Sequence, residues 1–549
     1  MSEALQMQKD HKEKKRQLDM KKSVEKSGHL LVLLFLFCFA IVYPLYFRDG
    51  YTQITTYKFQ YLKIIAFLFG GLLLIVNAFY LLIPSKMSDG AKVSIGSRVA
   101  GSLKNLSATD IFILLYGAVL IFSFMLSDFP QEALWGTDGW YMGFVTQMIC
   151  IGIYYFVSRF YDGKESRIWY LMGISFLIFL WGLLNRFSIY PITMENASVE
   201  YISSIGNINW FCGYWSVFFV MGPVIYILTE DMASRIFSGI YSMVALGLAA
   251  VEGSDSAFVS LGIVFFLLFL VCFEKRRWLE RYLEIIAIMT GTWQVFRLIH
   301  YLFPEQLNFW NITISFVLGN ATLIVFIMAV LLRVIIDDPE KETLHKAFHI
   351  VKWVVVSAVI LLLAGYIILL IMNTRSRGNI GSLSDNGLFI FDSSWGSSRG
   401  MTWKDGILIF NSFPGWRKWV GAGPDCFTMY AYTHPAISYL LENQFGGVRL
   451  TNAHNEMITI LVNTGILGLL TFLGIFISSI VRHLRKMKQN PMCLIIAVSA
   501  ISYLFHNIFS FQQIVNTPFA FLMLGLGENI LRKESSYKRK QGLERSEAD

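Results

Sequence analysis

Apolar stretches of roughly twenty residues recur along the chain and are separated by short polar segments. A stretch of this length crosses the hydrocarbon core of a bilayer as an α-helix. The pattern therefore predicts an all-α polytopic membrane protein with about fourteen transmembrane helices. The predicted spans are 30–47, 62–83, 109–127, 140–159, 168–187, 209–229, 236–252, 256–273, 282–302, 312–332, 351–372, 457–481, 491–509 and 514–531.

Basic residues alternate between the segments that connect these spans. Lys and Arg cluster in 1–29, 84–108, 274–281, 482–490 and 532–549. Both are absent from 128–139, 188–208, 303–311 and 510–513. Because cytoplasmic loops carry an excess of basic residues, we expect a multi-pass protein of the cytoplasmic (plasma) membrane with both termini in the cytoplasm.

One connection, residues 373–453, is much longer than the others, and the alternation of spans places it outside the cytoplasm. We call it the long loop. Long connections are usually either functional or disordered, and nine Trp, Phe and Tyr residues between positions 395 and 432 argue against disorder. We therefore expect one long structured extracytoplasmic loop that acts as a catalytic lid. The predicted parts of the chain are a basic cytoplasmic tail (1–29), transmembrane helices 1–11 (30–372), the long loop (373–453), transmembrane helices 12–14 (454–531) and a cytoplasmic tail (532–549).

Composition agrees with a membrane protein and changes the interpretation of the charge. The chain is 55% hydrophobic and 15% charged, with a mean hydropathy of +0.53, whereas soluble proteins average about 25% charged residues. Its net charge of +8 is explained by the cytoplasmic segments, so no nucleic-acid partner is predicted. The six cysteines form no CxxC pair and no Walker-type phosphate loop is present, which argues against a disulfide framework and an ATP-driven pump.

Several short motifs lie in or near the long loop. Residues 397–410 have the spacing of an amphipathic helix, with Trp403, Ile407 and Phe410 on one face. The other motifs are Gly421-Ala422-Gly423-Pro424 (the glycine–proline turn), Ala453-His454-Asn455, Asn463-Thr464-Gly465-Ile466-Leu467-Gly468 and, upstream, Gly206-Asn207-Ile208-Asn209 and Ser254-Asp255-Ser256.

Together with Arg399 in the amphipathic segment, these motifs resemble the O-antigen ligase and polymerase superfamily over roughly 200–480. Its members share an arginine–tryptophan helix, a GxGP turn, an HN pair before a span that carries GxxG, and an upstream GNxN segment. Many members have an SR pair where this chain has Ser254-Asp255. The missing arginine puts a phosphate-binding role at that position in doubt.

The resemblance implies a GT-C-like fold and an inverting, metal-independent glycosyltransferase without cofactors. Such an enzyme passes a glycan from a polyprenyl (undecaprenyl) diphosphate donor to an acceptor glycan or lipid anchor at the outer face of the membrane, in contact with membrane lipids. Polymerase, ligase and protein glycosyltransferase activities share these motifs. The alternative is a transporter, above all a flippase for lipid-linked oligosaccharides, although flippases usually have two similar halves and this chain has no internal repeat.

The same resemblance assigns candidate roles to individual residues. Arg399, with Arg375 or Arg377, would neutralise the diphosphate, because guanidinium binds phosphate oxygens bidentately. His454 would act either as the general base or as a hydrogen-bond donor to the diphosphate. Asn455 could orient the imidazole or cap the following helix, and Glu456 is a second candidate base. Candidate supporting residues are Asn455, Glu456, Trp403, Asn207 and Arg297. Snorkelling to the membrane interface would explain Arg375, Arg377 and Arg297 about equally well.

Overall fold

A computed structural model describes residues 2–83, 104–308, 311–336, 343–381 and 387–546. These residues confirm the all-α class, because their one sheet is an antiparallel pair of two-residue strands, β1 (Tyr201–Ile202) and β2 (Gly206–Asn207). The long helices are α1 (Ser2–Leu36), α3 (Ile54–Leu82), α5 (Ala108–Met125), α7 (Phe144–Phe160), α8 (Ile168–Arg186), α9 (Ile208–Phe218), α10 (Met221–Leu228), α11 (Met232–Val251), α12 (Ser256–Cys272), α13 (Arg276–Leu302), α15 (Asn320–Ile336), α16 (Thr343–Arg375), α17 (Trp395–Asn411), α20 (Pro435–Phe445), α21 (Glu456–Leu484), α22 (Pro491–His506) and α23 (Thr517–Ser546). The short ones are η1 (Phe37–Val42), α2 (Tyr43–Leu45), α6 (Pro130–Trp135), η2 (Glu165–Arg167), η3 (Pro304–Gln306), α14 (Ile312–Val317), α18 (Arg417–Val420) and α19 (Phe427–Thr433).

The described residues contain nine helical segments that are long and apolar enough to cross a membrane. Three shorter apolar helices, α7, α12 and α22, accompany them. Of the two remaining predicted spans, 282–302 lies within α13 and 514–531 overlaps α23, and both helices also carry charged segments. The chain is therefore a multi-pass membrane protein, while the count of about fourteen spans and the GT-C assignment stay predictions.

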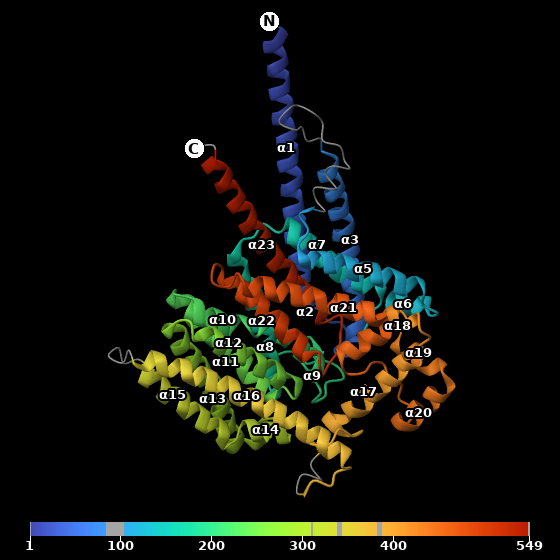
Figure 1. Cartoon of the computed structure of the whole chain (residues 1–549), viewed down its shortest axis with the longest axis vertical. Coiled ribbons are helices and arrows are strands. Elements are labelled where there is room, and N and C mark those ends of the chain that lie inside the picture. Colours follow the sequence, from blue (N-terminus) through green and yellow to red (C-terminus); the bar gives the residue numbers. More distant parts are fainter. Residues whose placement is uncertain (1, 84–103, 309–310, 337–342, 382–386, 547–549) are drawn as a thin grey trace.

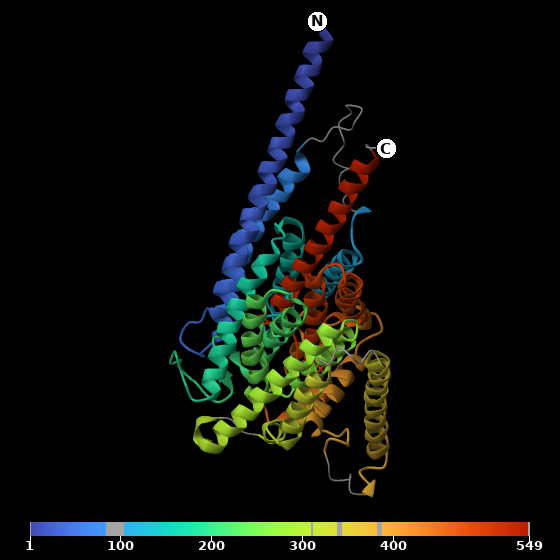
Figure 2. The same cartoon turned by 90° about the vertical axis from the view of Figure 1, so that its left-hand side faces the viewer.

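The helices differ strongly in how deeply they are buried. The span formed by α9 and α10 is 83% buried over its most apolar window, whereas the corresponding window of α16 is 0% buried. Figure 2 shows α16 standing apart from the bundle. Because α16 is apolar on all sides and contacts little protein, we expect lipid to surround it. Both chain termini lie at one end of the molecule, and α17 lies toward the opposite end (Figure 1).

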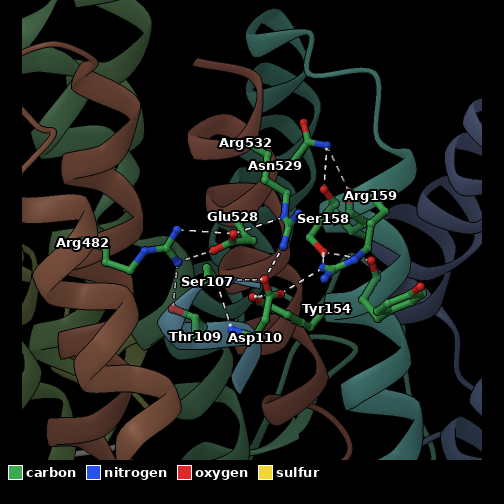
Figure 3. A network of polar contacts seen from close by, with 12 residues as sticks. Ser107, Thr109, Asp110, Tyr154, Ser158, Arg159, Arg482, Glu528, Asn529 and Arg532 are labelled. Atoms are coloured by element: carbon green, nitrogen blue, oxygen red, sulfur yellow. Dashed lines mark hydrogen bonds and ion pairs between the residues drawn. The ribbon is translucent and has the colours of Figure 1, made fainter. Parts of the chain in front are cut away.

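A network of ion pairs joins four helices through two buried carboxylates (Figure 3). Asp110 of α5 pairs with Arg159 of α7 at 3.0 Å and with Arg532 of α23. Glu528 of α23 pairs with Arg532 at 3.2 Å and with Arg482 of α21. Both carboxylates are 2% exposed. Removal of Asp110 would leave Arg159 without its carboxylate partner, and removal of Glu528 would do the same to Arg482, whereas Arg532 pairs with both carboxylates. The network thereby fixes the C-terminal end of α21, the helix whose N-terminal end follows His454.

The described part of the long loop forms the helices α17 to α20, which pack around a small apolar core that also includes Ala133 of α6 and Val462 of α21. Predicted helix 397–410 corresponds to α17, but Gly396, Ser397 and Ser398 adopt left-handed backbone angles at its start. The face that packs inward contains Gly400, Thr402, Asp405, Gly406 and Ile409. On the predicted apolar face, Ile407 is 40% exposed, whereas Trp403 packs against Trp395 and Phe509 and Phe410 packs against Phe413.

Candidate active site

The glycine–proline turn packs into a break in α21. The helix is interrupted at Gly465, which has φ 72° and ψ −170°. Next to this break, the backbone N–H groups of Ala422 and Gly423 donate to the carbonyl oxygens of Val462 and Asn463, each at 2.9 Å. The two motifs that were recognised separately in the sequence are therefore halves of one backbone joint. This joint fixes the first two turns of α21 relative to the long loop.

Gly421 begins this turn with a φ of 75°, and a Cβ at this position would lie 2.3 Å from the Asn463 carbonyl oxygen. Gly421→Ala is expected to lower the free energy of unfolding by about 2–4 kcal/mol, because the left-handed backbone and the steric overlap both oppose a side chain there. Thermal unfolding in detergent would measure the loss. Gly262→Ala is the control, since a Cβ at Gly262 meets no atom within 4 Å. Equal melting temperatures for the two variants would contradict the joint.

Arg399 lies in the first turn of α17 after the left-handed residues and points toward the turn that follows α22. Its Nε donates to the carbonyl oxygen of Phe509 at 3.0 Å, and its Nη1 donates to that of Gly396 at 2.9 Å. The guanidinium carbon lies 5.9 Å from the centre of the Phe509 ring. Burial lowers the pKa of Arg399, and the negative charge of Asp255 opposes this shift. The guanidinium is still charged at neutral pH, with its orientation fixed by two backbone carbonyls.

His454 precedes α21 and has a left-handed φ of 48°. Its backbone N–H donates to Asn452 Oδ1 at 2.9 Å, and its ring meets that of Phe511 edge to face at 5.3 Å. Burial and the positive charge of Arg399 lower the pKa of His454 to about 4. At neutral pH the imidazole is therefore uncharged and able to accept a proton.

The next two residues of this motif have structural contacts. Asn455 caps α21, because its Oδ1 accepts a hydrogen bond from the Ile458 N–H at 3.1 Å. Of the two expectations for Asn455, the structure realises the helix cap. The Glu456 carboxylate is buried and accepts a hydrogen bond from the Gln512 backbone N–H, while its own N–H donates to the Asn507 carbonyl oxygen at 2.9 Å.

Residues 506–513, from the last residue of α22 into its connection to α23, hold these groups together. We call this segment the α22–α23 turn. It supplies Phe509 to Arg399, Phe511 to His454, and Asn507 and Gln512 to Glu456. The sequence analysis did not predict this segment. Two features of the sequence mark it: a second His-Asn pair at 506–507 and a polar run in a short loop between apolar spans.

The upstream motifs reach the same place through a chain of side-chain contacts. Asn207 caps α9 by accepting from the Asn209 N–H at 2.9 Å. From Asn209 the contacts continue through Ser254, Ser256 and Cys212 to His506, with successive separations of 2.9, 2.8, 3.5 and 3.5 Å. Asp255 is also close enough to Arg399 to act on its charge. The segment Ser254-Asp255-Ser256, which lacks the family's arginine, therefore borders the site and contributes the negative charge of Asp255.

The remaining predicted residues are placed as follows. Trp403 packs with Trp395 and Phe509, at ring-centre distances of 5.3 and 5.8 Å, and so walls the site beside Arg399. Arg375 and Arg377 are exposed where α16 ends, and Arg297 is exposed on α13. Among the described residues, no contact links these three arginines to Arg399 or His454.

In the parts of the chain that the structure describes, no group of three or more His, Cys, Asp or Glu side chains is arranged to hold a metal ion. No curated protein matches the chain. Residues 307–473 match the family model described as O-antigen ligase. This segment includes Arg399, Trp403, the glycine–proline turn and His454, and excludes the two upstream motifs. Residues 307–473 are therefore identified as an O-antigen ligase domain, which covers about a third of the chain.

Proposed function

We propose that the protein is a membrane glycosyltransferase that moves a glycan from a polyprenyl diphosphate to an acceptor glycan or lipid anchor at the outer face of the cytoplasmic membrane. The family match supports a glycosyltransferase-like enzyme and disfavours the flippase alternative. The observation that carries the proposal is the pairing of an oriented guanidinium, Arg399, with a neutral imidazole, His454, outside the apolar spans.

In the proposed reaction, the acceptor hydroxyl oxygen attacks the anomeric carbon of the donor sugar as the bond to the diphosphate oxygen breaks. The hydroxyl proton passes to the neutral ring of His454, and polyprenyl diphosphate leaves with the bonding electron pair. One displacement from the opposite face inverts the anomeric configuration. Arg399 stabilises the negative charge that develops on the leaving oxygen, and preorganised charges of this kind usually supply the largest part of catalysis.

The arrangement of Arg399 suits this role. Its Nε and Nη1 are held by protein carbonyls, and Nη2 has no hydrogen bond to the described residues. The free Nη2 edge is therefore available to a phosphate oxygen without a change of rotamer. We propose that Arg375 or Arg377 adds a second positive charge.

The test is a transfer assay with purified protein in lipid nanodiscs, supplied with an undecaprenyl-diphosphate-linked oligosaccharide as donor and a second oligosaccharide as acceptor. We expect a new glycosidic bond of inverted configuration by NMR, stoichiometric release of undecaprenyl diphosphate, and no loss of rate in EDTA. A ladder of products would identify a polymerase, and a single addition a ligase. Lipid movement between leaflets without a new glycosidic bond would contradict the proposal.

A further inference from the structure

A small polar cavity lies beside His454 and is not accounted for by the proposed diphosphate site. It is bounded by the first turns of α21, by α5 and α7, and by the α22–α23 turn. Phe511 and Asn452 both line it and both contact His454. Its volume of about 20 Å³ admits one water-sized group, since about 10–15 Å³ is the least that a water molecule needs.

The walls of the cavity carry hydrogen-bonding atoms that lack partners. Trp140 Nε1, Gln512 Nε2 and Asn463 Oδ1 are buried and have no hydrogen bond among the described residues. Gln512 and Asn463 are only 7% and 9% exposed. Buried polar atoms in folded proteins are almost always paired. Two donors and one acceptor around a space of this size therefore indicate a bound group that both donates and accepts.

The acidic side chains that line the cavity restrict which kind of group can bind there. The carboxyl groups of Asp425 and Glu456 both line it, and Asp425 is held by the N–H groups of Thr137 and Met142 at 2.8 and 3.0 Å. Burial raises the pKa of Asp425 to about 7. Two acidic side chains make this an unfavourable place for a phosphate oxygen, in contrast to the surroundings of Arg399. A hydroxyl group is neutral and both donates and accepts hydrogen bonds.

The cavity is also rigid, and aromatic rings border it. Gln512 is held by Gln147 Nε2 at 2.5 Å and by the Glu456 carboxylate. The rings of Trp140 and Phe511 meet edge to face at 4.8 Å, and such rings offer apolar surface next to a polar atom. Apolar surface beside fixed polar groups matches the mixed surface of a sugar ring.

We propose that this cavity is a subsite that binds a hydroxyl group of the acceptor sugar and so positions that sugar against His454. The inference rests on the proposed glycan transfer. The acceptor is the favoured occupant because its reacting hydroxyl must reach the His454 ring, whereas the donor sugar is attached to the diphosphate beside Arg399. Binding at fixed donors and acceptors orients the sugar before reaction.

Trp140→Phe tests the subsite, because it removes one N–H donor and keeps an aromatic ring. With the oligosaccharide pair of the transfer assay, we expect the KM for the acceptor to rise about 5-fold to 50-fold, the usual effect of one lost buried hydrogen bond. The KM for the donor and kcat at saturating acceptor should change less than about twofold, since a hydrogen bond of equal strength in the bound ground state and in the transition state affects only the acceptor KM. Trp169→Phe, on α8 and in ring contact with Phe237, is the matched control.

Gln512→Met provides a second variant, in which the unpaired amide is replaced by an apolar chain of similar length. Melting temperatures of both variants are measured first, so that unfolding is not mistaken for lost recognition. An unchanged acceptor KM in both variants, with wild-type transfer intact, would overturn the subsite and leave the proposed function standing. A rise in the donor KM alone would also overturn it, by assigning the cavity to the donor sugar. A wild-type protein that transfers nothing would remove the proposed function and this inference together.

Discussion

Arg399→Ala is expected to lower kcat for glycan transfer by about 100-fold to 1,000-fold, the size of effect seen when one preorganised donor to a developing negative charge is removed. The substitution removes the guanidinium that two carbonyls orient and whose Nη2 edge is unoccupied by protein. Rates of release of undecaprenyl diphosphate at saturating donor and acceptor would measure the effect.

A matched control separates loss of this guanidinium from loss of positive charge on α17. Lys404 lies on the same helix, is exposed, and donates to the Phe391 carbonyl oxygen at 3.2 Å. Lys404→Ala should change kcat less than about threefold, because an exposed cation contributes little in water. If both variants lost the same activity, the rate would depend on the charge of the loop surface and the assignment of Arg399 would be wrong.

Arg399→Lys should fall between wild type and Arg399→Ala. Lysine keeps a positive charge but lacks the planar fork that allows Arg399 to bind the Phe509 carbonyl and a phosphate oxygen together. The exposed Arg375 and Arg377 are expected to contribute less individually, because no protein contact orients them toward the site in the described structure.

The long apolar runs made the helical fold predictable, since each predicted span overlaps a helix of the structure. The motifs also selected Arg399 and His454 as candidate site residues, and the roles of these two residues stay predictions. What such patterns cannot supply is side-chain contact between distant positions. The carbonyl that orients Arg399 comes from Phe509, 110 residues further along the chain.

The sequence also did not predict the backbone geometry around Arg399 and His454. Ser397, Ser398 and His454 adopt left-handed angles without being glycine, and no residue preference marks them. The sequence also did not predict which face of helix 397–410 packs inward. Small residues, Gly400 and Gly406, let the backbone of α17 pack closely, so the inward face is the one with little side-chain volume. A Cβ on Gly406 would lie 2.5 Å from Ile458.

His454→Ala is expected to lower kcat by about 100-fold to 10,000-fold, the usual contribution of a positioned acid or base. The lowered pKa of His454 favours one of the two roles that the sequence left open. Burial and Arg399 lower the pKa of His454 to about 4, so the ring is neutral at pH 7 and can take the acceptor proton. An imidazolium that donates to the diphosphate would instead need a pKa above the working pH.

The pH dependence tests this assignment directly. Because the pKa of His454 is lowered, the base is lost only as the pH falls through about 4. The kcat/KM of the wild type should therefore stay level from pH 8 to about pH 5, whereas a histidine with an ordinary pKa of about 6.5 would begin to fail below pH 7. As the pH falls, kcat should begin to decrease at a higher pH than kcat/KM does. The reason is that bound diphosphate offsets the positive charge of Arg399, which lowers the pKa of His454 in the free enzyme.

Chemical rescue provides the control for His454→Ala. The side chain lies against Phe511 without a hydrogen bond from its ring to any described residue, so its removal leaves space that a small base can enter. Added imidazole should restore part of the rate, and methylated imidazoles should follow their basicity until size excludes them. A donor to the diphosphate would respond in the opposite direction, since the more acidic imidazolium is the better donor. Rescue that grows as basicity falls would therefore identify His454 as a diphosphate ligand and transfer the role of base to another group.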